Sequence, residues 1–279
     1  MRNLSVLMAF ERRSWLRRLF NFSLFRSKGA TGQIISMHQS GTHWLKFMLA
    51  NAISEHFSVP SPKYNHANDI IGGPKDTIMY PQIPRLLASH TIPSPFFYSI
   101  LSRPFNLPKY VLLIRDLRLS LISNYRKWRH TYRVNFSAYL EGDPAGKKYN
   151  SDIWWAFRFL NCWGCYVKKQ PTKILVVRYE DLVRRPTLEL ERINQFWLLG
   201  LPKNALRKAT EFASKEAMAI RNDPTRPSGA VQMSSKEYSS LFSVEDKARF
   251  RRLCADHLSH SFGYDYETGW EDLVATRDE

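Results

Sequence analysis

A polar turn with hydroxyl groups and one glycine lies early in the chain, within Ser36–Met48, which reads SMHQSGTHWLKFM. The apolar run QIIS precedes the turn and a helical pattern follows it. Free N–H groups at the start of a helix bind anions, Gly41 lets the backbone approach a ligand, and Ser40 and Thr42 add hydroxyl donors. The turn therefore predicts a phosphate-type site, although the nucleotide-loop pattern GxxxxGK[ST] is absent and the turn has no lysine.

A second set of side chains suited to an anion follows the apolar run YVLLIR. Arg115 ends that run, and Ser123 lies eight residues later, less than two turns into a predicted helix. A guanidinium can hold a phosphate through two hydrogen bonds, and the serine can face the same anion. Asp116 is suited to cap the start of the helix. The simpler interpretation is a surface Arg–Asp pair, which would contribute little.

The elements that would hold these side chains alternate along the chain. From Gly32 onward, short apolar runs alternate with helical stretches, and YVLLIR is continuous in the way of a parallel strand buried on both faces. The alternation predicts one three-layer α/β domain, residues 29–279, with a central parallel β-sheet covered by helices. The predicted strands are QIISM, RLLASH, YVLLIR and KILVVR, and the predicted helices are Thr42–His56, Leu117–Arg129, residues 152–169 and the segment from Pro186.

Four features lie where predicted strands end, namely the turn Gln39–Trp44, His90, Arg115 and Tyr179. In parallel α/β sheets, ligands bind at the carboxyl ends of the strands. We therefore expect these four features to meet at one site. The indole of Trp44, at the end of the turn, offers a flat face on which a nucleotide base could stack.

The composition narrows the class of ligand. The formal net charge is +16, and 44% of the 279 residues are hydrophobic, enough for a core. The charge predicts an anionic partner, but no nucleic-acid-binding module is recognisable, so we expect no nucleic acid. Three cysteines without a secretory signal do not indicate a disulfide framework. The CxxC pair, Cys162 and Cys165, is interpreted as packed thiols and not as a metal site.

The first 28 residues form a basic amphipathic arm. They hold seven Arg and Lys residues against a single acid, Glu11. The apolar run LSVLMAF is far too short to span a bilayer, and the arginines that follow it are unlike a signal cleavage site. Apolar side chains alternate with arginine pairs, which favours peripheral contact with an anionic membrane. The alternatives are an arm packed on its own domain and a targeting sequence.

Three stretches together resemble the sulfotransferases that use 3′-phosphoadenosine 5′-phosphosulfate (PAPS). SGTHW, LIRDLRLSLIS and VVRYEDL are similar in order and spacing to that family's PKSGTTW, RDPRDxxxS and YEDL. The similarity runs from about Gly32 to Asp265, and GDPAGKKYNSDIWWAF and ASKEAMAIRNDP resemble the cytosolic branch. The resemblance implies a P-loop nucleotide-kinase-like fold and a cytoplasmic enzyme. It also implies transfer of a sulfuryl group from PAPS, without a metal, to a hydroxyl or amine of a small molecule, lipid or glycan.

The resemblance implies a role for each candidate residue. His90, in ASHTIP, resembles the family's general base, which takes the proton of the acceptor. Gln39 stands where the family has a lysine that touches the bridging and sulfonate oxygens, so we expect it to bind the cofactor and to take part in catalysis. The other expected cofactor contacts are Ser40, Gly41, Thr42 and His43 at the 5′-phosphosulfate, Trp44 and Tyr179 at the adenine, and Arg115, Ser123, Arg226 and Gly229 at the 3′-phosphate.

The missing loop lysine raises the question of where positive charge comes from. A glutamine donates hydrogen bonds without a charge, and a charge-assisted hydrogen bond is about twice as strong as a neutral one. Ala88 also stands where the cytosolic branch often has an active-site lysine. We expect the cation to be protonated His38 or His43, or Arg85. Lys46 lies a full turn into the predicted helix and is expected to point away.

Two other functions remain open at this level. A small-molecule kinase would share the architecture, but GK[ST] and an obvious Walker-type magnesium aspartate are missing. Gln39 and Ala88, which stand where relatives have lysines, motivate the second alternative, a non-catalytic nucleotide-binding relative. The aromatic segments Phe96–Phe105 and Trp128–Tyr149 are expected to wall the acceptor pocket without identifying the acceptor. No sequence feature indicates the oligomeric state.

Overall fold

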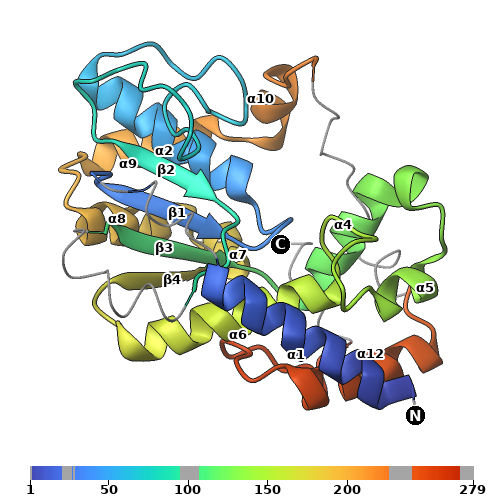
Figure 1. Ribbon diagram of the computed structural model, residues 1–279. Helices are drawn as coiled ribbons and strands as arrows, with labels where there is room; N and C mark the ends of the chain where they lie inside the picture. Colours follow the sequence, from blue (N-terminus) through green and yellow to red (C-terminus); the bar gives the residue numbers. More distant parts are fainter. Residues whose placement is uncertain (1, 21–26, 28, 95–106, 226–240, 271–279) are drawn as a thin grey trace.

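Four short apolar segments pair into one sheet, and every pair of neighbouring strands is parallel. The strand order is β2-β1-β3-β4 (Figure 1). The predicted α/β fold with a central parallel sheet is therefore confirmed. The strands are β1 (Gly32–Ser36), β2 (Leu86–Ser89), β3 (Lys109–Ile114) and β4 (Ile174–Arg178). The structure, a computed structural model, describes residues 2–20, 27, 29–94, 107–225 and 241–270.

Helices cover both faces of the sheet and give three layers (Figure 1). Because side chains alternate along a strand, Ile34 and Val111 join a cluster with α2, α8 and α9, while Ile35 and Leu112 join one with α4, α6 and α12. The helices are α1 (Arg2–Phe20), α2 (Thr42–Phe57), α4 (Leu117–Tyr132), α5 (Phe136–Glu141), α6 (Ile153–Lys169), α7 (Tyr179–Arg184), α8 (Pro186–Trp197), α9 (Lys203–Phe212), α10 (Lys215–Ile220) and α12 (Val244–His257).

The ends of these elements decide which side chains reach the site. β2 ends at Ser89, so His90 is the first residue beyond the strand. Its side chain therefore need not follow the alternation of side chains between the two faces of the sheet. The side chain of Asp116 accepts the backbone N–H of Arg118 at 2.8 Å, which confirms the predicted cap of α4. After β4 the chain first forms α7 and then restarts at Pro186 in α8, where the sequence predicted only the second helix.

Helix α1 packs on the domain beside α6 and α12 (Figure 1). The ring of Phe10 is buried, with its centre 5.2 Å from that of Trp154 and 5.7 Å from that of His257. In the residues that the structure describes, no helix is long and apolar enough to cross a membrane. One face of α1, in the basic arm, therefore belongs to the hydrophobic cluster that also contains residues of α4, α6 and α12.

Candidate functional site

The turn between β1 and α2 has a backbone that requires glycine. Gly41 has a φ of 86°, and a Cβ there would lie 2.6 Å from ring carbons of Tyr179. Gln39 also has a positive φ, 61°. Ser40 is fully buried, and its hydroxyl closes the turn by donating to the carbonyl oxygen of Met37 at 2.6 Å. No side chain caps α2, so the N–H groups of its first turn are suited to an anion.

A chain of hydrogen bonds joins this turn to the candidate base. The hydroxyl of Thr42 donates to the hydroxyl oxygen of Ser36 at 2.8 Å, and that oxygen lies 3.2 Å from Nδ1 of His90. Nδ1 also lies 2.7 Å from the carbonyl oxygen of Ser36. A carbonyl oxygen can only accept, so Nδ1 carries the proton and the neutral ring keeps a lone pair on Nε2. This is the tautomer in which Nε2 can take a proton from an acceptor.

Two further histidines surround the base. The ring of His38 stacks on that of His90 with centres 4.1 Å apart, and it lies 4.4 Å from the ring of Trp155. Burial lowers the pKa of His38 to about 3, with smaller contributions from His90 and Lys127. His43 is exposed on one side, yet the protein packed around its ring lowers its pKa to about 3 as well. Both histidines are neutral near pH 7.

The same surroundings keep the candidate base uncharged. His90 is open to the site, but dense packing around its ring lowers its pKa. The hydrogen bond to the backbone of Ser36 opposes this shift, and the positive charges of Lys46 and Lys127 reinforce it. A neutral imidazole is the form that a general base needs. Position and electrostatics therefore agree with the predicted role of His90.

The expected sources of positive charge at the turn are not supported. His38 and His43 are neutral, for the reasons given above. Arg85 precedes β2 at the amino end of the sheet, and its carbonyl oxygen accepts from Thr31 there. The four residues of β2 separate it from His90, so that their backbones lie roughly 16 Å apart. All three hypotheses for the missing cation are therefore wrong.

Arg115 is buried next to the turn. Its Nη1 donates to the carbonyl oxygen of Gln39 at 2.9 Å and to the hydroxyl of Ser123 at 3.3 Å. Its guanidinium lies 4.5 Å from the ring centre of Tyr179. Among the described residues, Nε and Nη2 have no hydrogen-bond partner. A buried guanidinium with two unpaired N–H groups beside a serine hydroxyl fits an anionic ligand, as predicted for this pair.

Two aromatic rings flank the other side of the turn. The indole N–H of Trp44 donates to the carbonyl oxygen of Ala213 at 2.9 Å, which fixes the orientation of its ring. Its ring centre lies 6.4 Å from that of Tyr179, with the planes at 67°. Both rings are partly exposed. The turn, Arg115, Ser123, Trp44 and Tyr179 therefore meet at the carboxyl ends of β1, β3 and β4, as expected.

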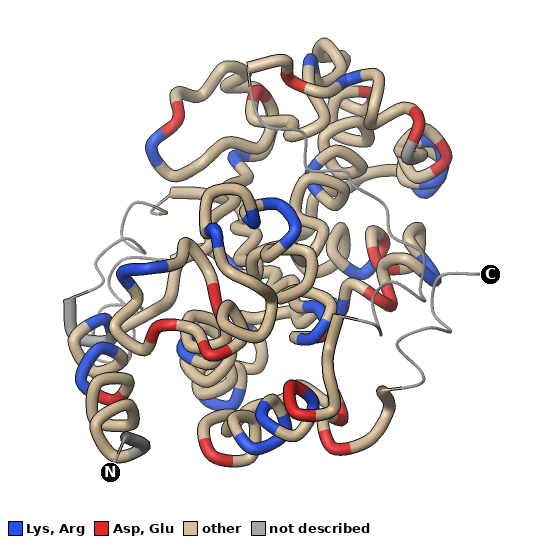
Figure 2. Tube along the Cα trace, turned by 90° about the vertical axis from the view of Figure 1, so that its right-hand side faces the viewer, with Lys and Arg blue, Asp and Glu red and all other residues tan. Residues whose placement is uncertain are grey.

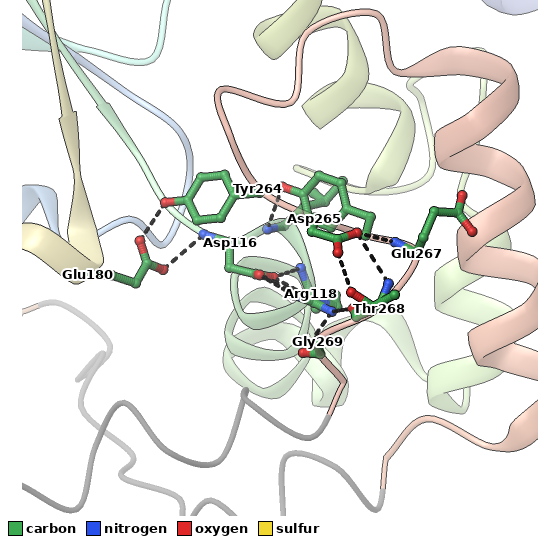
Figure 3. Close-up of polar contacts among 10 residues, drawn as sticks. Asp116, Arg118, Glu180, Tyr264, Asp265, Glu267, Thr268 and Gly269 are labelled. Atoms are coloured by element: carbon green, nitrogen blue, oxygen red, sulfur yellow. Dashed lines mark hydrogen bonds and ion pairs between the residues drawn. The ribbon is translucent and has the colours of Figure 1, made fainter.

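The sequence reasoning missed a polar network behind Arg115 and Tyr179 (Figure 3). One carboxylate oxygen of Glu180 accepts the backbone N–H of Asp116 at 3.0 Å, and the other accepts the hydroxyl of Tyr264. The carboxylate of Asp116 pairs with Arg118 at 2.7 Å. Arg118 in turn donates to the carbonyl oxygens of Thr268 and Gly269. The one available signal was an acid directly after each predicted ligand, in IRD and RYE.

The network ties three parts of the chain together. Asp116 follows Arg115, and Glu180 follows Tyr179, so the two strand ends that carry these ligands are linked directly. Burial and the neighbouring Glu180 raise the pKa of Tyr264, so its hydroxyl keeps the proton that it donates. The result is a rigid frame behind the anion site.

Some predicted residues lie outside the part of the chain that the structure describes. These are Arg226, Gly229 and the whole segment Phe96–Phe105. The other expected acceptor wall, Trp128–Tyr149, spans the end of α4 and α5. In the described ranges, no group of three or more His, Cys, Asp or Glu side chains is placed to hold a metal ion.

Solved structures similar to this chain include a sulfotransferase and retinol dehydratase. Mouse sulfotransferase SULT7A1 complexed with PAP matches with a TM-score of 0.55 and 16% identity over 90% of this chain and 92% of that one. Retinol dehydratase in complex with androsterone and the inactive cofactor PAP matches with a TM-score of 0.53 and 15% identity over 87% of this chain and 85% of that one. Retinol dehydratase in a complex with retinol and PAP matches with a TM-score of 0.51 and 16% identity over 84% of this chain and 83% of that one. At these identities the likeness shows the fold.

Sequence comparisons give the family. No curated protein matches the chain. The sulfotransferase domain model, in contrast, matches residues 33–262, which include the turn, His90, Arg115, Ser123 and Tyr179. Together with the parallel sheet and the likeness to solved sulfotransferases, this match covers most of the chain. The chain therefore belongs to the sulfotransferase family.

Proposed function

We propose that this protein transfers a sulfuryl group from PAPS to a hydroxyl or amine of a small-molecule, lipid or glycan acceptor. The observation that carries the proposal is the placement of His90, whose Nδ1 is bound to Ser36 and whose Nε2 is left to act as a base beside the anion-binding turn. Family membership supports this function over the small-molecule kinase alternative.

The residues present fit PAPS. The first-turn N–H groups of α2 suit the 5′-phosphosulfate, Nε and Nη2 of Arg115 with Ser123 suit the 3′-phosphate, and the rings of Trp44 and Tyr179 suit the adenine. When bound, PAPS supplies the sulfuryl group and a phosphate as leaving group. The described site would therefore recognise both anionic ends and the base of the cofactor.

The chain's own contribution to the reaction is position and proton transfer. Nε2 of His90 takes the proton from the acceptor's hydroxyl or amine as that group forms its new bond to sulfur. Ser36 holds the ring, and His38 and Trp155 pack behind it, so the lone pair stays aimed at one place. A positioned base of this kind contributes about 10²–10⁴-fold in rate.

The test combines a binding measurement with an acceptor screen. PAP without magnesium should raise the melting temperature of the protein, because it binds the folded state. Radiolabelled PAPS with a panel of phenols, alcohols, amines, lipids and sugars should then give a labelled product that disappears in His90→Ala. Binding of PAP without transfer to any acceptor would instead support the non-catalytic relative. Failure of PAP to bind would reject both.

We also propose that α1 rests on an anionic membrane surface. Leu4, Met8 and Trp15 are 65%, 65% and 58% exposed and, at 3.6 residues per turn, share one face. The buried Phe10 and Ser14 lie on another face, against the domain. Basic residues recur along α1 in Figure 2, which gives the charge that anionic lipids attract. The family resemblance implies the cytoplasmic side.

Vesicles test this proposal on the full chain. The protein should sediment with phosphatidylserine-containing vesicles and much less with neutral phosphatidylcholine vesicles. Replacing Leu4, Met8 and Trp15 with serine should remove the binding. The matched control is Ile220→Ser, because Ile220 is 85% exposed on α10. Equal sedimentation of the triple variant and the wild type would reject the proposal.

A further inference from the structure

Lys46 has a position that its place in the sequence did not suggest. It lies in the second turn of α2, but its side chain is buried, with only 4% of the residue exposed. Its ammonium donates to the amide oxygen of Asn68 at 2.6 Å. The amide of Asn68 is neutral, and it helps to position the ammonium. The expectation that Lys46 points away from the site is therefore wrong.

The helix places Lys46 on the side of the turn that faces the base. Thr42 and Lys46 are four residues apart in α2, so they share a face. The hydroxyl of Thr42 reaches Ser36, which holds His90. The neighbouring strand β2 carries only a methyl group at Ala88, which packs against the same cluster as α2.

The electrostatics agree with this placement. The charge of Lys46 lowers the pKa of His43, at the start of α2, and that of His90. The sulfuryl group would pass from the anion-binding turn, where His43 begins α2, to an acceptor whose proton goes to Nε2 of His90. An ammonium close to both histidines is thus next to the path of transfer. The charge of Lys127 also lowers the pKa of both histidines, but Lys127 is an exposed residue of α4.

We propose that Lys46 is a catalytic residue of this protein and supplies, from helix α2, the positive charge that the turn lacks at Gln39. This inference rests on the proposed sulfuryl transfer. During transfer the bond from sulfur to the bridging oxygen breaks, and negative charge grows on the departing phosphate. The acceptor oxygen or nitrogen forms the new bond to sulfur, and its proton goes to His90. Lys46 contacts the oxygens of the sulfuryl group and the bridge as this charge develops.

Three variants test the charge directly. Lys46→Met keeps the length and loses the charge, so kcat should fall about 10²–10³-fold, as for the loss of one preorganised donor, while PAP affinity stays within about threefold. Lys46→Arg should recover part of the rate. In the double variant Lys46→Met with Gln39→Lys, the charge returns from the other side, and kcat should rise at least about tenfold above that of Lys46→Met.

Matched controls separate this role from a structural one. Lys208→Met removes an exposed lysine paired with Glu55 at 2.7 Å and should leave kcat unchanged. If Lys46→Met does not fold, Asn68→Ala, which removes the amide oxygen that accepts from the ammonium, should lower kcat while PAP binding is kept.

A spectroscopic measurement tests the effect of the Lys46 charge on His90 without any need for turnover. The imidazole signals of His90, identified with His90→Gln in histidine-labelled protein, report its pKa. Removing the charge of Lys46 should raise that pKa, because the charge now lowers it. Wild-type kcat together with an unshifted pKa in folded Lys46→Met would overturn the inference and leave the proposed function intact. Wild-type protein that transfers no sulfuryl group would overturn the proposed function itself.

Discussion

The two halves of the site are built in different ways. In the half that suits the 3′-phosphate and adenine, Arg115, Ser123 and Tyr179 stand where the family pattern puts them, and Glu180 links their strand ends. In the half next to His90, the turn carries Gln39 and neutral histidines, with a buried lysine from α2. In the proposed function, cofactor recognition thus follows the family pattern, whereas the proposed charge for transfer comes from α2.

The largest effect expected from this contrast is on transfer alone. His90→Ala removes the base, so kcat should fall about 10²–10⁴-fold, while the Kd for PAP changes by less than about twofold. Transfer of radiolabelled sulfate and calorimetric titration with PAP measure the two quantities. His130→Ala, on the exposed end of α4, is the control. A comparable loss of PAP affinity in His90→Ala would show that the two halves are not separate.

The complementary change acts on binding. Arg115→Met removes two N–H groups that suit the 3′-phosphate, and hydrogen bonds to charged groups contribute about 1.5–3 kcal/mol each. PAP affinity should therefore fall roughly 100-fold or more. The measurement is calorimetric titration, with the exposed Arg207→Met as control. Wild-type affinity in Arg115→Met would remove this residue from the cofactor site.

A smaller effect should come from the frame behind the binding half. Tyr264→Phe deletes the hydroxyl that donates to Glu180, at a cost of about 1 kcal/mol, which is about fivefold in PAP affinity if the whole loss acts on the frame. Urea unfolding and PAP titration should both show it, in contrast with Tyr80→Phe on a surface loop. An effect on stability without any effect on affinity would mean that the network does not position Arg115 and Tyr179.

The smallest effect concerns pH. Transfer needs neutral His90, and its pKa is lowered from the ordinary value of about 6.5. The ring therefore stays neutral as the pH falls through that value, and kcat should drop by less than half between about pH 8 and about pH 6.5. An acid limb centred at or above about pH 6.5 would contradict the lowered pKa.

Regular elements and the binding half were predictable because they depend on local patterns. The four strands, the cap at Asp116 and the convergence of the turn with Arg115 follow from apolar periodicity and the geometry of parallel sheets. The protonation states of His38 and His43 could not be predicted from the sequence, because they depend on burial between segments far apart in the sequence.

Side-chain direction was the other source of error. Spacing alone puts Lys46 on the face of Thr42, but only the fold shows that this face turns toward His90. The hydroxyl of Ser40 donates within the turn, to the carbonyl oxygen of Met37, and residue spacing does not reveal this contact. The CxxC pair was interpreted as two packed thiols, yet Cys165 is exposed because a helix cannot bury residues on all sides at the surface.

The contact of Gly41 with Tyr179 limits how this site could change over generations. The ring of Tyr179 fills the place that a side chain at position 41 would need, and Arg115 lies against the same ring. A larger residue at position 41 would be strained by the positive φ there and would also need a smaller residue in place of Tyr179, which would loosen Arg115. Substitutions in the turn before α2 and at the end of β4 are therefore not independent of each other.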